Sequence, residues 1–169
     1  MQIINEEKPY LALFNNFKHA GAVVWIGTKS KSRAPMNIHR EIHAEIGGLQ
    51  GDRYHRANPE SKRQVTLVQY EHLQSVASFL GISEIDPALI RRNIVVKGIN
   101  LHALKGKKFK IGDAILETTD LCYPCSRMEE NLGHGGFNAM RGHGGITCKV
   151  IDPGLIRLGD AIEIIRDIQ

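Results

Sequence analysis

The chain has 169 residues, of which 42% are hydrophobic and 24% charged, proportions that are ordinary for a soluble globular protein. Its net charge is only +4, and it has neither the dense basic face nor the row of aromatic residues that nucleic-acid binding requires. No apolar run approaches the length of a membrane span. We therefore expect one main domain with no nucleic-acid or membrane partner.

The N-terminal region lacks the basic start and the long apolar core of a secretory signal. Residues 1–19 have no clear hydrophobic period and are interpreted as an N-terminal arm, although Leu11, Leu13 and Phe14 could pack on the core. Residues 20–169 are expected to form the main domain. An odd number of cysteines, three, favours free thiols in a reducing cytoplasm over a disulfide framework.

Short apolar runs between glycines and polar loops predict strands along most of the chain. Two similar segments place Gly-Asp between apolar runs, which predicts a hairpin or a sharp corner between strands. The strongest helical pattern covers residues 70–80 and ends at Gly81, and residues 87–90 suit one helical turn. The sequence thus predicts a mainly β fold with some helix, a closed or nearly closed mixed β-barrel. The expected strands lie at 22–26, 38–44, 64–69, 94–96 and 146–150, and the Gly-Asp segments at 110–117 and 157–164.

Cys122 and Cys125 form a C-x-x-C pair ahead of a predicted short helix. Ser126 and Glu129 match a capping box, and Leu132 followed by Gly133 marks the end of that helix. Cys125 would then lie just outside the helix N-terminus, where unpaired N–H groups and the helix dipole favour a thiolate. Arg127 adds a nearby cation. A thiolate either attacks an electrophile or binds a soft metal such as zinc or molybdenum.

Four interpretations of the cysteine pair remain open from the residues alone. The pair could join His134, His143 or Cys148 in a structural zinc site, although the spacing is irregular. It could be a redox dithiol, although the βαβ setting typical of thioredoxin-like motifs is absent. It could provide a single functional thiolate, Cys125, or consist of two inert buried cysteines. Cys148 itself lies on a predicted strand and is expected to be a small buried residue.

Glycine-rich and basic segments elsewhere suit an anionic ligand. The glycines around Gly135 and Gly144 recur in two Gly-His-Gly-Gly segments, whose backbone N–H groups could cradle an anion or simply form loops. Three glycines precede Asp52 and Arg53, which suggests a tight loop that aims polar side chains, or a plain turn. The trio 91–93, Arg-Arg-Asn, could fork onto a phosphate or carboxylate, or form an exposed basic turn.

Five segments of the chain occur in an order typical of one family. They are Gly51-Asp52-Arg53-Tyr54, Arg91-Arg92-Asn93-Ile94-Val95, Phe109 with Ile111-Gly112-Asp113-Ala114, Cys122-Tyr123-Pro124-Cys125, and Gly154-Leu155-Ile156 with Gly159-Asp160. In this order they resemble a MOSC domain, the C-terminal domain of molybdenum cofactor sulfurases, and the resemblance covers roughly residues 20–165. Longer relatives carry an N-terminal β-barrel domain or a desulfurase domain, and we expect this chain to be a stand-alone copy with neither.

The resemblance implies a β-barrel-like fold that binds the molybdenum cofactor, a phosphorylated pyranopterin, with Cys125 as ligand to the metal. It implies either a reductase of small N-hydroxylated compounds, supplied with electrons by a separate donor protein, or a module that carries the cofactor or a Cys125 persulfide to a cofactor-handling enzyme. In the reductase, a few polar side chains would orient the cofactor and the substrate, and one of two further side chains would relay a proton. The expected orienting residues are Arg53, Arg92 and Asn93, with Arg127, Gly135 and Gly144 near the cofactor, and the expected proton relay is Asp52 or His55.

Overall fold

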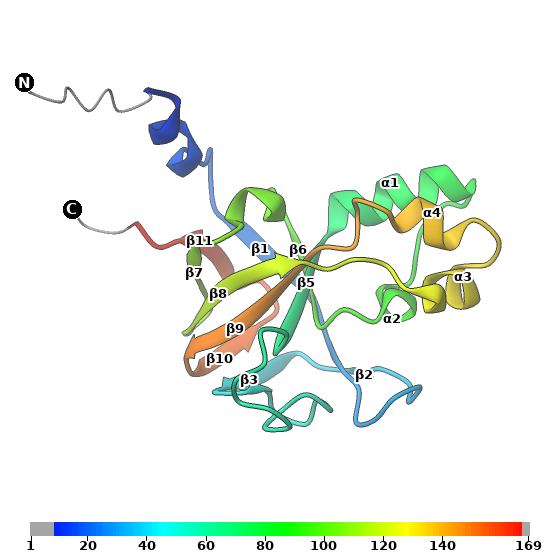
Figure 1. Cartoon of the computed structure of the whole chain (residues 1–169), viewed down its shortest axis with the longest axis horizontal. Helices are drawn as coiled ribbons and strands as arrows, with labels where there is room; N and C mark the ends of the chain where they lie inside the picture. The colour runs from blue at the N-terminus through cyan, green and yellow to red at the C-terminus, as the bar shows by residue number, and fades with distance from the viewer. Residues whose placement is uncertain (1–8, 167–169) are drawn as a thin grey trace, which may run out of the picture.

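A closed barrel of seven strands, with short helices gathered at one end, makes up most of the molecule (Figure 1). The computed structural model describes residues 9–166. The prediction of a mainly β, closed mixed barrel is confirmed. In the order in which they pair, the barrel strands are β11 (Ala161–Ile164), β7 (Lys108–Ile111), β8 (Ala114–Leu121), β9 (Ile146–Asp152), β5 (Val65–Gln69), β6 (Ile94–Lys97) and β1 (Gly21–Thr28).

The barrel closes where β1 pairs with β11, with Gly21 opposite Ile162. Neighbouring strands are antiparallel except β5 and β6, which are parallel. A parallel pair needs a long crossover, and here the crossover contains α1 (Tyr70–Leu80) and α2 (Pro87–Ile90). Both helices were expected, and Gly81 ends α1 in the left-handed conformation (φ 68°), as a C-terminal glycine should.

A smaller sheet of β10 (Gly154–Arg157), β3 (Glu41–Glu45) and β4 (Gly48–Leu49) packs against the barrel. The first Gly-Asp segment forms the β7–β8 hairpin, whereas the second is a corner, because β10 pairs with β3 and β11 pairs with β7 and β1. The single strand expected over 38–44 is wrong: β2 (Asn37–Ile38) pairs with β1 and is separate from β3. Accordingly Ile38 is exposed and Ile42 is buried.

Two apolar clusters stabilise this arrangement. The larger fills the barrel and includes Leu67, Phe109 and Cys148, all fully buried, so the expectation that Cys148 is a small core residue is confirmed. The second lies between the barrel wall and the helices, where Val68 and Val95 contact residues of α1, α3 (Ser126–Leu132) and α4 (Gly136–Met140). This second cluster fixes the helices on the end of the barrel, and α4 is a helix that the sequence pattern did not predict.

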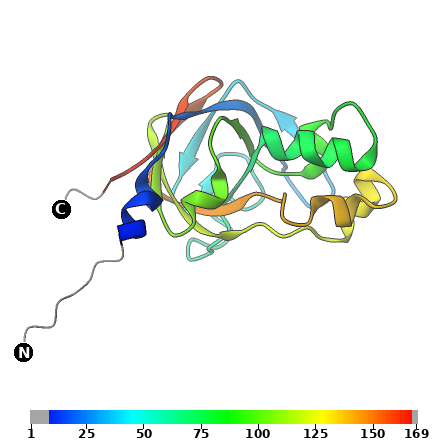
Figure 2. The same ribbon diagram turned by 90° about the horizontal axis from the view of Figure 1, so that it is seen from above.

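The N-terminal segment stands away from the barrel. Residues 1–8 of the expected arm lie outside the described part of the chain, and Pro9–Asn15 form a 3-10 helix, η1, that projects from the barrel in both views (Figure 2). The suggestion that Leu11, Leu13 and Phe14 pack on the core is wrong, because each is more than half exposed. A second 3-10 helix, η2 (Leu101–Leu104), follows β6. Among the described residues, no helix has the length and apolarity that crossing a bilayer requires.

Candidate functional site

The cysteine pair lies at the end of the barrel where β8 ends and β9 begins. Residues 122–125 connect β8 to α3, and the Cys122 N–H donates to the Gly145 carbonyl at 2.8 Å. Cys122 is buried, with 3% of its surface exposed, whereas Cys125 is exposed and both are free thiols. The two cysteines therefore differ: Cys125 can meet a ligand and Cys122 is part of the packing.

Cys125 lies just outside the first helical residue of α3, as the sequence predicted, but it occupies the N-cap position that the predicted capping box assigned to Ser126. The predicted capping box is wrong, because Ser126 is already the first helical residue. The Glu129 carboxylate instead accepts hydrogen bonds from the N–H groups of Gly135 (2.8 Å) and Phe137 (2.9 Å), which lowers the pKa of Glu129 and ties α3 to α4. The Glu129 carboxylate thus binds backbone N–H groups of the glycine-rich turn and not the N–H group at the start of its own helix.

Arg92 is a charged residue that lies near both cysteines. Its Nε donates to the Gly144 carbonyl at 2.7 Å and its Nη1 to the Ile90 carbonyl at 3.0 Å, while its Nη2 is buried without a hydrogen-bond partner among the described residues. Burial lowers the pKa of Arg92, and the nearby Cys122 and Cys125 act in the opposite direction. An arginine stays protonated in proteins, so a buried cation with a free donor lies beside the cysteine loop.

Further cations surround this position, and we call them with Arg92 the basic cluster. Arg91 Nη2 is also buried without a partner in the described chain, and its pKa is lowered by burial and by the charges of Arg127 and Arg53. Lys29 is 7% exposed, and burial lowers its pKa to about 8, with Asp52 partly opposing the shift. The basic cluster consists of Lys29, Arg53, Arg63, Arg91, Arg92 and Arg127.

Asp52 and Asn93 organise the backbone under the basic cluster. The Asp52 carboxylate is buried and accepts hydrogen bonds from the N–H groups of Lys29 and Tyr54 and from Asn93 Nδ2 (3.0 to 3.1 Å). Asn93 Oδ1 accepts from both the N–H and the hydroxyl of Thr66. Each side chain is fully engaged with protein groups, so both act here by holding the loops that carry the cations.

Glycines allow the chain segments at the site to approach closely. A Cβ added at Gly144 would overlap the Cys122 carbonyl oxygen and would lie 3.2 Å from Arg92 Nη2. A side chain at that position is therefore excluded by the backbone of the cysteine loop itself. Gly135 has a different environment, because it lies in the α3–α4 turn and its N–H is taken by Glu129. Of the two repeated glycine segments, the second forms part of the site.

The structure brings most, not all, of the expected site residues together. Asp52, Asn93 and Gly144 belong to the same hydrogen-bonded unit or loop as the members of the basic cluster. His55 lies elsewhere in its loop and bonds Glu45 of β3 at 2.8 Å. Lys29 and Arg63 belong to the basic cluster but were not expected to be site residues. Lys29 follows β1 and Arg63 precedes β5, so only the positions of these strands in the folded chain could have indicated them. The expected residues in the cluster are Arg53, Arg92 and Arg127.

The zinc-site and redox-dithiol interpretations of the cysteine pair find no support in this geometry. In residues 9–166, no three His, Cys, Asp or Glu side chains are close enough together to hold a metal ion. His134 is fully exposed, and its nearest acidic partner is Glu129 at 3.6 Å. The C-x-x-C pair follows a barrel strand, and only one of its thiols is exposed.

Comparison with known proteins identifies the family. A family model described as MOSC domain matches residues 40–163, about three quarters of the chain. The chain belongs to the MOSC domain family. The resemblance carried by the sequence motifs is thus confirmed, and MOSC domains are a family associated with the molybdenum cofactor. No functionally curated protein matches the chain.

Solved structures share the MOSC fold over most of their length. The YuaD protein from Bacillus subtilis superposes with a TM-score of 0.72 at 21% identity, over 86% of this chain and 96% of that one. YiiM from Escherichia coli gives 0.65 at 18% identity, over 88% and 71%. YiiM from Geobacillus stearothermophilus gives 0.70 at 14% identity, over 86% and 75%. At these identities the likeness concerns the fold.

Proposed function

We propose that this MOSC protein binds the molybdenum cofactor and reduces small N-hydroxylated compounds, with Cys125 as ligand to the metal. The observation that carries the proposal is a pair of buried guanidinium nitrogens, Arg91 Nη2 and Arg92 Nη2, that have no hydrogen-bond partner among the described residues. Arg92 lies near Cys125, the exposed thiol of the pair. A buried cation that keeps an unsatisfied donor is unfavourable. An anionic ligand that also needs a thiolate would satisfy both features at once.

The residues present fit such a cofactor. Its phosphate would be held by Arg91 and Arg92 through charge-assisted hydrogen bonds, with Lys29 and Arg127 adding positive charge. Sulfur is a suitable ligand for a soft, redox-active metal, and Cys125 is the exposed cysteine at this end of the barrel. When bound, the cofactor supplies the oxidation-state change of the metal, and a separate donor protein supplies the electrons.

The reaction must also provide protons. Reduction of an N-hydroxyl group breaks the N–O bond and consumes two electrons and two protons, and the oxygen leaves as water. Asp52 and His55, which the sequence suggested as the relay, are hydrogen-bonded to protein groups, so we assign the relay to Lys29, whose pKa of about 8 lets it give up a proton near neutral pH. Asp52 accepts a hydrogen bond from the backbone N–H of Lys29, and its charge opposes the lowering of the Lys29 pKa.

A carrier function is the second candidate, and the exposed position of Cys125 favours it as well. In that case Cys125 would hold a persulfide sulfur, or the bound cofactor, for transfer to a cofactor-handling enzyme. The carrier would contain cofactor or sulfane sulfur and show no turnover of N-hydroxylated compounds with any electron donor. The same anion site would serve both functions.

Elemental analysis provides the first test. The full chain would be expressed in a host that makes the molybdenum cofactor, and molybdenum would be measured in the wild type, in Cys125→Ala and in the matched control Cys122→Ala. We expect about one molybdenum per chain in the wild type and the control, and loss of the metal in Cys125→Ala. A Cys125→Ala protein that keeps its molybdenum and its activity would contradict the assignment. Turnover of an N-hydroxylated benzamidine then separates the reductase from the carrier.

A further inference from the structure

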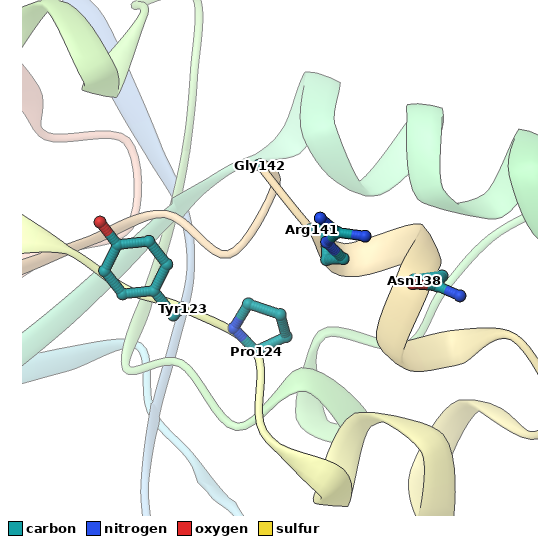
Figure 3. Close-up of a pocket in the computed structure, with 5 residues that line it drawn as sticks. All are labelled: Tyr123, Pro124, Asn138, Arg141 and Gly142. Atoms are coloured by element: carbon teal, nitrogen blue, oxygen red, sulfur yellow. The ribbon is translucent and has the colours of Figure 1, made fainter.

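An open pocket of about 710 Å³ lies beside the cysteine loop. Figure 3 shows Tyr123 and Pro124 of that loop on one side, and Asn138 and Arg141 at the end of α4 on the other, with Gly142 between α4 and the barrel. Pro124 is bonded directly to Cys125, so the pocket adjoins the proposed metal ligand. Of these five residues, Gly142 alone belongs to a segment that the sequence suggested for anion binding.

Arg141 brings a positive charge to this pocket that its protein neighbours do not offset. Its side chain is exposed, and none of the ion pairs formed by residues 9–166 includes it. The acidic residues of the facing helix α3 are engaged elsewhere. Glu129 accepts the backbone hydrogen bonds of the α3–α4 turn, and Glu130 pairs with Arg33 at 3.1 Å.

The opposite side of the pocket offers flat apolar surface. The Tyr123 side chain is 66% exposed, and Pro124 presents its ring next to it (Figure 3). Aromatic and proline rings contact planar groups over a large area, and a guanidinium matches the two oxygens of a carboxylate. The pocket therefore combines flat apolar surface that can contact a planar group with a guanidinium that can bind a carboxylate.

We propose that this pocket binds the substrate of the neighbouring site and selects aromatic carboxylates, with Arg141 as the residue that determines specificity. This inference rests on the proposed function, since it assigns the substrate class of that site. Arg141 binds the carboxylate and Asn138 adds a hydrogen bond. Tyr123 and Pro124 contact the ring, and the N-hydroxylated group is directed towards Cys125.

Binding can be tested without cofactor or turnover. Benzoate and its neutral isostere benzamide would be titrated into the purified full chain, with the backbone amide shifts followed by NMR. We expect benzoate to move the amide signals of Tyr123, Asn138 and Gly142, and to bind about 10-fold more tightly than benzamide. In Arg141→Gln this preference should be lost. Arg40→Gln, which removes an exposed arginine between β2 and β3, should leave it unchanged.

The outcomes distinguish this inference from the proposed function. Equal binding of both probes, no binding of benzoate at millimolar concentration, or an unchanged preference in Arg141→Gln would overturn the substrate class while leaving the molybdenum test untouched. With cofactor-loaded protein, an N-hydroxylated benzamidine carrying a carboxylate should show a KM about 10-fold higher in Arg141→Gln with little change in kcat. The carboxamide analogue should show no such rise, and Arg141→Lys should restore part of the loss.

Discussion

Three histidines that play no part in the proposed chemistry should make the stability of the protein depend on pH. His72 of α1 packs edge-on against His102 of η2 and His143 of the loop before β9, with ring centroids 5.3 and 4.6 Å away. The Nδ1 atoms of His72 and His143 are buried without hydrogen-bond partners in the described chain. The pKa of His72 is lowered from 6.5 to about 4, mainly by burial and also by the nearby His143 and His102, against the opposing charge of Glu71.

The sign of the effect follows from the lowered pKa. Between pH 6.5 and 4 the unfolded chain binds a proton at His72 and the folded chain does not, so the folded protein loses stability as the pH falls through this window. At pH 5 a shift from 6.5 to about 4 corresponds to about 2 kcal/mol relative to pH 8. Because His72 is only partly buried, solvent screening reduces the expected loss to about 1 kcal/mol. The pKa of His143 is also lowered by burial, which acts in the same direction.

Urea unfolding at pH 8 and pH 5 provides the measurement. The wild type should lose about 1 kcal/mol more free energy of unfolding between these pH values than His72→Gln, whose own stability at pH 8 serves as its reference. The control is His43→Gln, which removes an exposed histidine of β3 and should keep the wild-type pH dependence. If His72→Gln and the wild type lose the same free energy between pH 8 and pH 5, then burial of His72 does not disfavour its charged form, and the reasoning fails.

Three further predictions test the packing around the site. In the native protein the exposed Cys125 thiol should react rapidly with iodoacetamide, whereas the buried Cys122 and Cys148 should react only on unfolding. Burial also raises the pKa of the Cys148 thiol, which slows its reaction further. Peptide mass mapping that finds early label on either buried cysteine would contradict this. Gly144→Ala should lower the free energy of unfolding by about 2 kcal/mol or more, because the added Cβ overlaps the Cys122 carbonyl, and a thermal unfolding curve equal to the wild type would refute the close approach. Asn93→Ala removes four side-chain hydrogen bonds and should cost about 3 kcal/mol in urea unfolding; a loss below about 1 kcal/mol would show that these bonds do not hold the loops.

Local patterns predicted much of the fold because each depends on neighbours in the sequence. The α1 helix ends at Gly81 as expected, since a helical period and a left-handed glycine are local properties. The break between β2 and β3 was missed, because it depends on which distant strand each piece pairs with. The capping box was wrong for a related reason, since the Glu129 carboxylate accepts hydrogen bonds from backbone N–H groups of the following turn.

By itself, the sequence determined the class of the fold, the family resemblance and the position of Cys125 ahead of a short helix. Those features are carried by hydrophobic alternation, glycine placement and motif order, all of which can be read along the chain. Only the tertiary structure decided that Cys125 is exposed while Cys122 is buried, and that Arg91 and Arg92 each keep a donor without a partner in the described part of the chain. It also decided that Arg141 and Tyr123 line the same pocket (Figure 3). Burial and charge compensation depend on segments that meet only when the barrel closes, so no local pattern contains them.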